Sequence, residues 1–238
     1  MSPGSGGGRS ERIAVLRADP DLADRLEGAR RARAEGLSVA RVVRRDRGAW
    51  ETAEDAGHAR DGLGLLVVEG TLVRRVGMAG RQGAELLSVG DVLQPARHDG
   101  EEATLPFDAT WHVLTPLRLA VLDLAWMARM APYPEVMAEI ASRIMLRSRR
   151  LASLLAIAQQ HRLDDRIQLL FWQLADRYGR VGPEGVRLEL RLTHELIGHL
   201  VGAYRPSVSA ALTRLQRAGL LRLEAGHWIL LGPAPESR

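Results

Sequence analysis

The chain has 238 residues, of which 46% are hydrophobic and 26% charged, a balance typical of a folded globular protein with one large core or two modest ones. It contains no cysteine, which excludes disulfides, thiolate metal sites and cysteine-held iron–sulfur clusters. The formal net charge is +4, but arginine replaces lysine throughout, a bias that indicates a GC-rich genome. The sequence pI of about 10.4 is therefore a weak indication of nucleic-acid binding.

The N-terminus and the apolar runs indicate neither a secretory signal nor a membrane span. Residues 1–10 are predicted to form a disordered tail, and SPGSGGGRSER has no apolar region of the kind found in secretory signals. The best candidate for a membrane span, residues 117–130, is interrupted by Arg118, Asp123 and Arg129. The sequence therefore predicts a cytoplasmic protein with no membrane partner.

A short charged helix is predicted over residues 18–36, and the pattern then changes to short apolar runs that are typical of β-strands. The predicted strands are residues 39–43, 64–68, 71–76, 85–87, 91–93, 110–114 and 117–122. Turns are predicted at Glu69-Gly70, Ala79-Gly80, Val89-Gly90 and Asp99-Gly100. Strands this short, separated by glycine turns, favour a barrel-like double sheet.

A long helix is predicted over residues 134–160, with an apolar seam on one face. The seam has seven-residue spacing, with further apolar positions between, and consists of Met137, Ile140, Ile144, Leu151, Leu154 and Ala158. Such a seam fits either packing against the helix's own β domain or parallel pairing of two chains. The polar residues that lie largely outside the seam are predicted to form a solvated face: Ser142, Arg143, Arg147, Arg149 and Arg150.

A second helix over residues 162–178 is predicted to begin a C-terminal domain, and residues 192–231 then read as helix, turn, helix and hairpin. Thr193 can cap the first helix of this segment, and Gly202 can end it. The Gly-Ala-Tyr turn has the length expected in a helix-turn-helix, and Pro206 falls in the first turn of the next helix, where its missing N–H costs nothing. Residues 220–223 and 228–231 are predicted to form a wing.

The second helix of this unit has a buried stripe of Val208, Leu212 and Leu215 and an outward face of small residues and arginine. Small side chains would let the backbone approach base edges, and Arg205 could contact guanine through two hydrogen bonds. The candidate DNA-contacting residues are Thr193, Arg205, Pro206, Ser207, Ser209, Ala210, Thr213 and Arg214. The alternative is a purely structural helical hairpin.

The run LTHELIGHLVGAYRPSVSAALTRLQRAGLL resembles the winged helix-turn-helix of the Crp-Fnr family of bacterial transcription regulators. In that family a threonine-led helix and a Gly-x-x-Arg turn precede a recognition helix that begins Arg-Glu-Thr and carries a second arginine. Here Arg205 keeps the first arginine, and Ser207 stands in the place of the threonine. Pro206 replaces the glutamate and Ala210 replaces the second arginine, so the resemblance implies the docking geometry and not the family's usual half-site. It also implies that the long helix is a dimer stalk.

A weaker resemblance covers GLGLLVVEGTLVRRV and AELLSVGDVLQP, which are similar to the effector domain of the same family. Cyclic-nucleotide-binding members continue with a Gly-Glu turn and an Arg followed by a small residue, which cradle the phosphate. This chain lacks both, and its loop has one arginine, Arg97, beside the acidic residues Asp99, Glu101 and Glu102. We therefore expect no cyclic nucleotide as cofactor, and the identity of any other effector is unknown.

The sequence gives little support for an enzymatic function. His194, Glu195 and His199 form HExxxH, whose histidines are five residues apart and point to different sides of a helix, unlike those of a zinc protease. His98 and His112 lack the closely spaced ligand pattern of a metal site. We therefore expect neither a metal nor an enzymatic activity.

Together these features predict an α+β protein with an N-terminal β-roll (a double-stranded β-helix), a long dimerisation helix and a C-terminal winged helix-turn-helix domain. The predicted divisions are a tail and helical lead-in at 1–36, a sensor β-roll at 37–130, the dimerisation helix at 131–160 and the DNA-binding domain at 161–238. The expected partners are double-stranded DNA and a second copy of the chain, and the resemblance makes RNA polymerase a further candidate. The alternative function is a β-roll that binds a small molecule or protein partner and carries a degenerate DNA-reading head.

Overall fold

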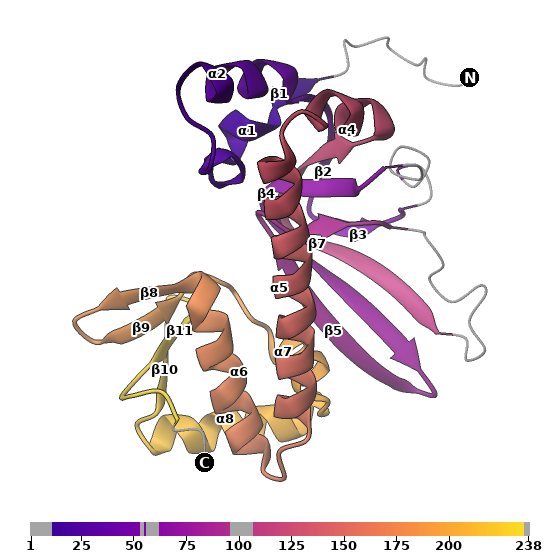
Figure 1. Ribbon diagram of the computed structural model, residues 1–238. Coiled ribbons are helices and arrows are strands. Elements are labelled where there is room, and N and C mark those ends of the chain that lie inside the picture. Colours follow the sequence, from indigo (N-terminus) through magenta and orange to yellow (C-terminus); the bar gives the residue numbers. More distant parts are fainter. Residues whose placement is uncertain (1–10, 53–54, 56–61, 96–106, 236–238) are drawn as a thin grey trace. The chain divides into compact units, whose positions relative to one another are not determined.

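The computed structural model describes residues 11–52, 55, 62–95 and 107–235 (Figure 1). The chain divides into two compact units: unit 1 comprises residues 1–74 and 86–148, and unit 2 comprises residues 75–85 and 149–238. The predicted turn at Asp99-Gly100 and the loop residues Arg97, Glu101 and Glu102 lie outside the described residues. No helix in the described ranges is both long enough and apolar enough to cross a membrane.

Seven described strands form the antiparallel sheet of the β-roll. They are β1 (Arg12–Ala14), β2 (Val39–Arg45), β3 (Gly48–Trp50), β4 (Gly64–Met78), β5 (Arg81–Ser88), β6 (Val92–Leu93) and β7 (Asp108–Leu122). The main path runs β1-β2-β7-β4-β5, while β3 adds to β7 and β6 adds to β4. Pairing of Val42 with Ala120 and of Trp50 with Trp111 fixes the register on β7. Strands β1 and β3 are too short to have been predicted from periodicity.

The predicted turn at Glu69-Gly70 is wrong, because β4 runs without interruption through both residues. Gly70 has φ +93°, and a Cβ there would lie 2.2 Å from the carbonyl oxygen of Pro116 on β7. Glycine is thus required by the close approach of two strands and not by a chain reversal. Pro116 likewise lies inside β7, which the sequence pattern divided into two strands.

The β-roll interior is filled by large apolar side chains. One buried cluster draws its members from β2, β3, β4, β5, β6 and β7: Val43, Trp50, Leu65, Val67, Leu72, Leu87, Leu93, Trp111, Val113, Leu117, Leu119 and Val121. The rings of Trp50 and Trp111 meet edge to face with their centroids 5.7 Å apart. Trp50 also donates a hydrogen bond through Nε1 to Asp55 at 2.8 Å, so the polar atom of this buried ring is satisfied.

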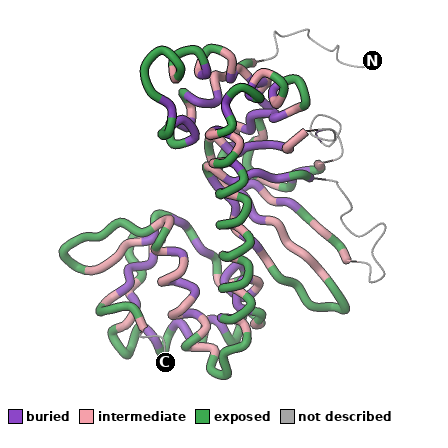
Figure 2. Tube along the Cα trace, in the orientation of Figure 1, coloured by how far each residue is buried: buried purple, intermediate pink, exposed green. Residues whose placement is uncertain are grey.

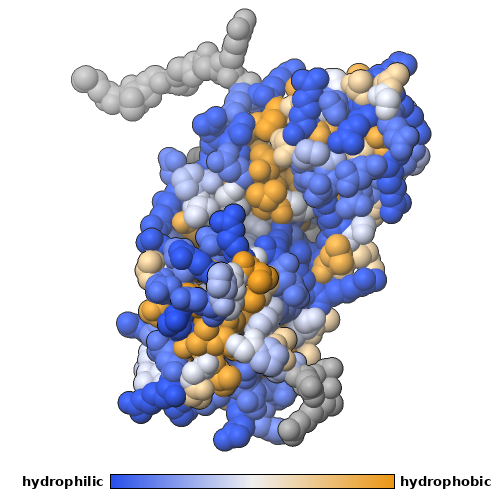
Figure 3. Space-filling view, turned by 90° about the vertical axis from the view of Figure 1, so that its left-hand side faces the viewer, coloured by the Kyte–Doolittle hydropathy of each residue, from blue (hydrophilic) through white to orange (hydrophobic). Residues whose placement is uncertain are grey.

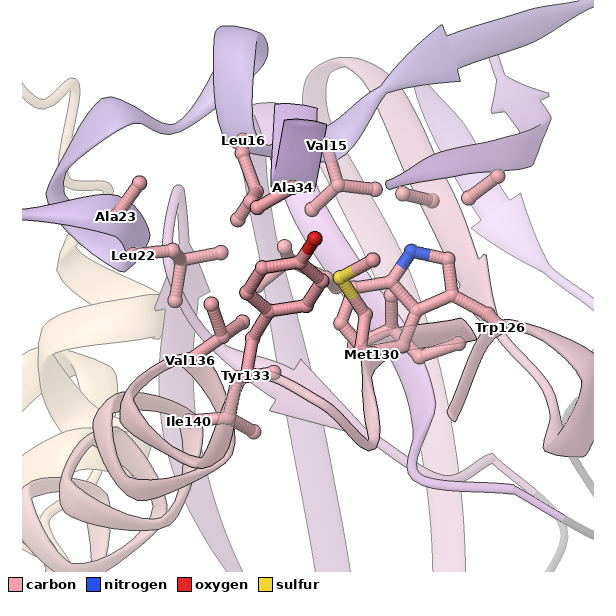
Figure 4. Close-up of a cluster of buried hydrophobic side chains, with 14 of the residues drawn as sticks. Val15, Leu16, Leu22, Ala23, Ala34, Trp126, Met130, Tyr133, Val136 and Ile140 are labelled. Carbon is pink, nitrogen blue, oxygen red and sulfur yellow. The ribbon is translucent and has the colours of Figure 1, made fainter. Parts of the chain in front are cut away.

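A second core joins the N-terminal segment to the helices that follow β7 (Figure 4). The single helix predicted over 18–36 is wrong: the segment forms α1 (Val15–Ala18), the 3-10 helix η1 (Pro20–Ala23) and α2 (Gly28–Leu37). Pro20 explains the break, since proline disfavours helical geometry at the preceding residue. Val15, Leu16 and Leu22 pack against Trp126 and Met130 of α4 (Leu124–Met130), a helix that the sequence pattern missed. Asp123 caps α4 by accepting a hydrogen bond from the backbone N–H of Trp126 at 2.7 Å.

The long helix α5 (Pro134–Ala158) confirms the predicted helix and ends two residues earlier than expected. Part of its predicted apolar seam packs within its own chain. Ile140 is 1% exposed, lies in the second core and therefore faces its own β-roll. The predicted solvated face is wrong for Arg143 and Arg147. Arg143 forms a bidentate ion pair with the buried Asp19, and Arg147 donates a hydrogen bond to the carbonyl of Val92 at 3.0 Å.

Unit 2 contains three packed helices and an antiparallel sheet. Its elements are α6 (Leu163–Tyr178), β8 (Gly179–Gly182), β9 (Gly185–Leu188), α7 (His194–Val201), α8 (Arg205–Arg217), β10 (Leu221–Glu224) and β11 (His227–Leu230). The sheet order is β10-β11-β9-β8, so the predicted wing is extended by a hairpin that the sequence pattern missed. The rings of Phe171 and Trp228, both buried, lie 5.6 Å apart and join α6 to the sheet.

Candidate nucleic-acid interface

The interface is built on α7, whose ends follow the predicted local signals. Thr193 caps the helix, because its hydroxyl accepts a hydrogen bond from the backbone N–H of Leu196 at 3.1 Å. Gly202 ends the helix in the left-handed conformation with φ +68°, a geometry that favours glycine. The apolar face of α7 is buried, with Ile197 and Val201 at 0% exposure. Thr193 itself is exposed, and its hydroxyl proton is free for an external acceptor.

Helix α8 follows the three-residue turn and packs on α6 and α7 (Figure 1). Pro206 occupies the first turn, as predicted, where no helical hydrogen bond is lost. Val208, Ala211, Leu212 and Leu215 form the buried stripe. Because these four residues account for the packing of α8 within unit 2, the opposite face remains in solvent.

The exposed face of α8 carries short side chains between two arginines. Pro206, Ala210, Thr213 and Arg217 recur at i, i+4, i+7 and i+11 and are all exposed, so they form one row along the helix. Arg205 lies beside the beginning of this row and Ser207 is also exposed. Among the described residues, neither the Arg205 nor the Arg217 side chain has an ion-pair partner. Arg217 is not among the predicted contact residues, although it continues the row by one turn beyond Thr213.

The two other hydroxyl-bearing candidates, Ser209 and Thr213, bond to the helix backbone. The Ser209 hydroxyl donates to the carbonyl of Arg205 at 3.1 Å, and the Thr213 hydroxyl donates to the carbonyl of Ser209 at 3.0 Å. Ser209 also lies 2.8 Å from Nδ1 of His194, which ties α8 to the start of α7. Ser209 is therefore partly buried and committed to packing, whereas the Thr213 oxygen can still accept a hydrogen bond.

Arg214 differs from the other arginines of α8 because it pairs with Asp164 in the first turn of α6. Its Nε donates to one carboxylate oxygen at 2.9 Å and a terminal nitrogen donates to the other at 2.5 Å. These hydrogen bonds lower the pKa of the Asp164 carboxyl below its ordinary value and raise that of Arg214. The helical pattern predicts Arg214 on the outward face but gives no sign of this partner, which is 50 residues away.

The histidines of the HExxxH segment have structural surroundings. His194 contacts Ser209 and lies against the Trp228 ring, with centroids 6.4 Å apart. Burial lowers the pKa of His199, which favours its neutral form. In the part of the chain that the structure describes, no group of three or more His, Asp or Glu residues is arranged to hold a metal ion.

The predicted dimer residues on α5 fall into two sets. Ile140 is buried and Met137 packs against the same core. Ile144 is 42% exposed and Leu151 37% exposed, while Leu154 and Ala158 are partly buried. Leu155, which the predicted seam did not include, is 68% exposed. Much of α5 is exposed (Figure 2), and orange patches of hydrophobic residues interrupt the hydrophilic surface in Figure 3.

Comparisons with known proteins agree with this geometry. Residues 149–234 match the family model of the Crp-like helix-turn-helix domain. A search of curated proteins found no match. Among solved structures, a CooA mutant from Carboxydothermus hydrogenoformans is similar with a TM-score of 0.64 and 18% identity, over 82% of this chain and 84% of that one.

Two further solved structures are similar in fold. FixK2 from Bradyrhizobium japonicum has a TM-score of 0.58 at 15% identity, over 80% of this chain and 92% of that one. TTHB099, a CRP-family transcriptional regulator from Thermus thermophilus, has a TM-score of 0.55 at 22% identity with the same coverage. The protein described above thus carries a Crp-like helix-turn-helix domain and has the fold of the Crp/Fnr family of transcription regulators.

Proposed function

We propose that this protein is a transcription regulator that binds DNA through α8. The observation that carries the proposal is the exposed row of short side chains on α8, with Arg205 at its start and Arg217 at its end. Short side chains at Pro206 and Ala210 let the helix backbone lie close to base edges in the major groove. An outward face meant for a protein partner would carry large apolar side chains instead, and α8 exposes none.

Arg205 and Arg217 are suited to different contacts because they lie at opposite ends of α8. Twelve residues separate Arg205 from Arg217, which corresponds to about 18 Å along the helix axis. A recognition helix reads bases through its N-terminal residues, so Arg205 is placed to donate two hydrogen bonds to guanine O6 and N7. Arg217, at the far end of α8, is then suited to contact a phosphate of the DNA backbone. The hydroxyl of Thr193 is suited to the same kind of contact.

We further propose that two copies bind a two-fold symmetric operator as a dimer paired along α5. The support is an exposed apolar row on α5 formed by Ile144, Leu151 and Leu155. Among the described residues of the same chain, none covers this row from water. Exposed large hydrophobic residues in a row are costly in water and are typical of an interface. Ile140 is not part of this proposal, because it belongs to the β-roll core.

The proposed regulation does not involve a cyclic nucleotide. The support comes from the sequence of residues 94–110, in which the phosphate-cradling residues are absent and carboxylates are present. Purified protein should therefore bind DNA equally with and without cyclic AMP or cyclic GMP. Saturable binding of either nucleotide in calorimetry, at one site per chain, would contradict this part of the proposal.

The experiment that tests the function is selection of bound duplexes from a random-sequence library, followed by sequencing. We expect enrichment of a two-fold symmetric site, with light scattering that shows a dimer both free and on DNA. A folded protein that enriches no sequence would refute DNA reading by α8. Enrichment of a single, non-repeated half-site by a monomer would refute the dimer and leave the reading surface in place.

A further inference from the structure

The ion pair between Asp164 and Arg214 places a carboxylate beside the proposed DNA-binding surface. Both hydrogen bonds between the two side chains lie within unit 2, at 2.5 and 2.9 Å. The Arg214 side chain remains 56% exposed and that of Asp164 is 31% exposed, so solvent or a ligand can reach the pair. The pair is therefore open to competition from an anion such as a DNA phosphate.

The position of the pair on α8 links it to DNA contact. Arg214 follows Thr213 directly and is one turn beyond Ala210, so it lies at the α6 edge of the exposed row. Arg205 and Arg217 have no ion-pair partner among the described residues, whereas Arg214 is held in a fork-like pairing with two parallel hydrogen bonds. One of three arginines on α8 is thus neutralised within the protein.

The pair adds to the stability of unit 2 but is not the main packing of α8. Exposed ion pairs generally contribute little to folding, although the bidentate geometry of this pair makes it stronger than most. The packing of α8 against unit 2 is already provided by its apolar stripe, including Val208 and Leu215 at 0% and 4% exposure. The Asp164 carboxylate also cancels a positive charge beside the proposed DNA-binding surface, which weakens attraction to DNA of every sequence.

We infer that Asp164 is a specificity-determining residue that withholds Arg214 from DNA phosphates and so lowers affinity for DNA of any sequence. This inference rests on the proposed function. Phosphate contacts provide most of non-specific binding, while base contacts provide discrimination. By neutralising Arg214 and leaving Arg205 free, Asp164 reduces the non-specific share and raises the ratio of specific to non-specific affinity.

The test is Asp164→Asn in the full chain, with Asp165→Asn as the matched control. Asp165 is the next residue of α6, is exposed and has no ion-pair partner among the residues described. Binding to a random-sequence duplex is measured by fluorescence anisotropy over a salt series, and thermal unfolding checks that each variant is folded. We expect Asp164→Asn to steepen the slope of log K against log salt by about 0.9 per bound chain, which corresponds to about eightfold tighter binding at 0.1 M salt. Asp165→Asn should change the slope much less.

A double-mutant cycle separates the effect of the Asp164–Arg214 pair from that of a change in net charge. Arg214→Ala leaves Asp164 without its partner and should weaken binding to random DNA. The double variant with both substitutions has lost one charge of each sign and should return close to the wild-type slope. An Asp164→Asn slope that is unchanged, shallower or equal to that of Asp165→Asn would overturn the inference. If the wild-type protein binds neither random nor selected DNA, both the proposed function and the role of Asp164 are refuted. If the wild-type protein binds DNA and Asp164→Asn leaves the salt slope unchanged, only the role of Asp164 is refuted.

Discussion

Gly198 is the position where a single added methyl group should separate α7 and α8, the two helices of the helix-turn-helix. A Cβ at Gly198 would lie 2.5 Å from the carbonyl oxygen of Ala203 and 3.7 Å from a methyl group of Val208. The first distance is 0.5 Å inside the 3.0 Å limit that real Cβ contacts respect, and the obstacle is backbone, which cannot rotate away. Gly198→Ala must therefore displace the turn that leads into α8.

The sign of the effect follows from two opposing contributions. In an open helix the change from glycine to alanine would stabilise by about 1 kcal/mol. Overpacking against a fixed backbone atom costs about 1 to 3 kcal/mol, and the displaced atom here belongs to the tight turn between α7 and α8. We therefore expect Gly198→Ala to reduce the free energy of unfolding of unit 2 by about 1 kcal/mol, although helix propensity alone predicts a gain.

Amide hydrogen exchange in α7 and α8 is the suitable assay, because it reports the stability of this unit separately from that of the β-roll. Gly182→Ala is the control in the same unit, since its Cβ would meet only one atom at 3.8 Å, an ordinary contact. That control should stay within about 0.5 kcal/mol of wild type. Exchange protection in Gly198→Ala equal to or above that of wild type would refute the steric argument.

Single side chains elsewhere in the chain give three other predictions. Arg205→Ala should cost about 1 to 3 kcal/mol at the selected operator and flatten discrimination at one base pair per half-site, and unchanged specificity in a binding titration would count against it. Ile144→Asp should give monomers in light scattering and lose operator binding. Leu146→Asp should leave the dimer intact, because Leu146 is 46% exposed but lies on the other side of α5. Glu11 accepts hydrogen bonds from Arg44 and Arg118, which lower the pKa of its carboxyl from 4.5 to about 2. The stabilising effect of the Glu11 carboxylate is therefore present above pH 4.5 and is lost as the pH falls towards 2. Glu11→Gln should therefore show a smaller fall in melting temperature over that interval than wild type.

The helix-turn-helix was predictable because its signals are local. Thr193 caps α7 three residues before its partner, Gly202 ends the helix and Pro206 begins the next one, and each signal depends only on its near neighbours. The predicted helices begin and end within about one residue of α7 and α8. The hairpin of β8 and β9 was missed, because its four-residue strands carry no clear alternation.

Contacts between distant residues could not be predicted in the same way. The partner of Arg143 is Asp19, 124 residues away, and nothing in the helical pattern of α5 distinguishes this arginine from a solvated one. The heptad spacing groups Ile140 with Ile144, and the two lie on the same face of the helix. It cannot show that the β-roll core covers Ile140 and leaves Ile144, one turn farther along, 42% exposed. Periodicity identifies an apolar face, but tertiary packing decides what covers it.

The chemistry of α8 limits how much sequence information one chain can read under the proposed function. Pro206 and Ala210 offer no hydrogen bond from their side chains, and the hydroxyl protons of Ser209 and Thr213 are already donated to the helix backbone. In the N-terminal half of α8, direct donation to base edges is therefore left to Arg205 and the exposed Ser207. Two such donors discriminate few base pairs, so a selective operator would need both half-sites at a fixed separation. Residues that set this separation, Ile144 and Leu155 on α5, would then determine the choice of DNA as strongly as the residues that touch it.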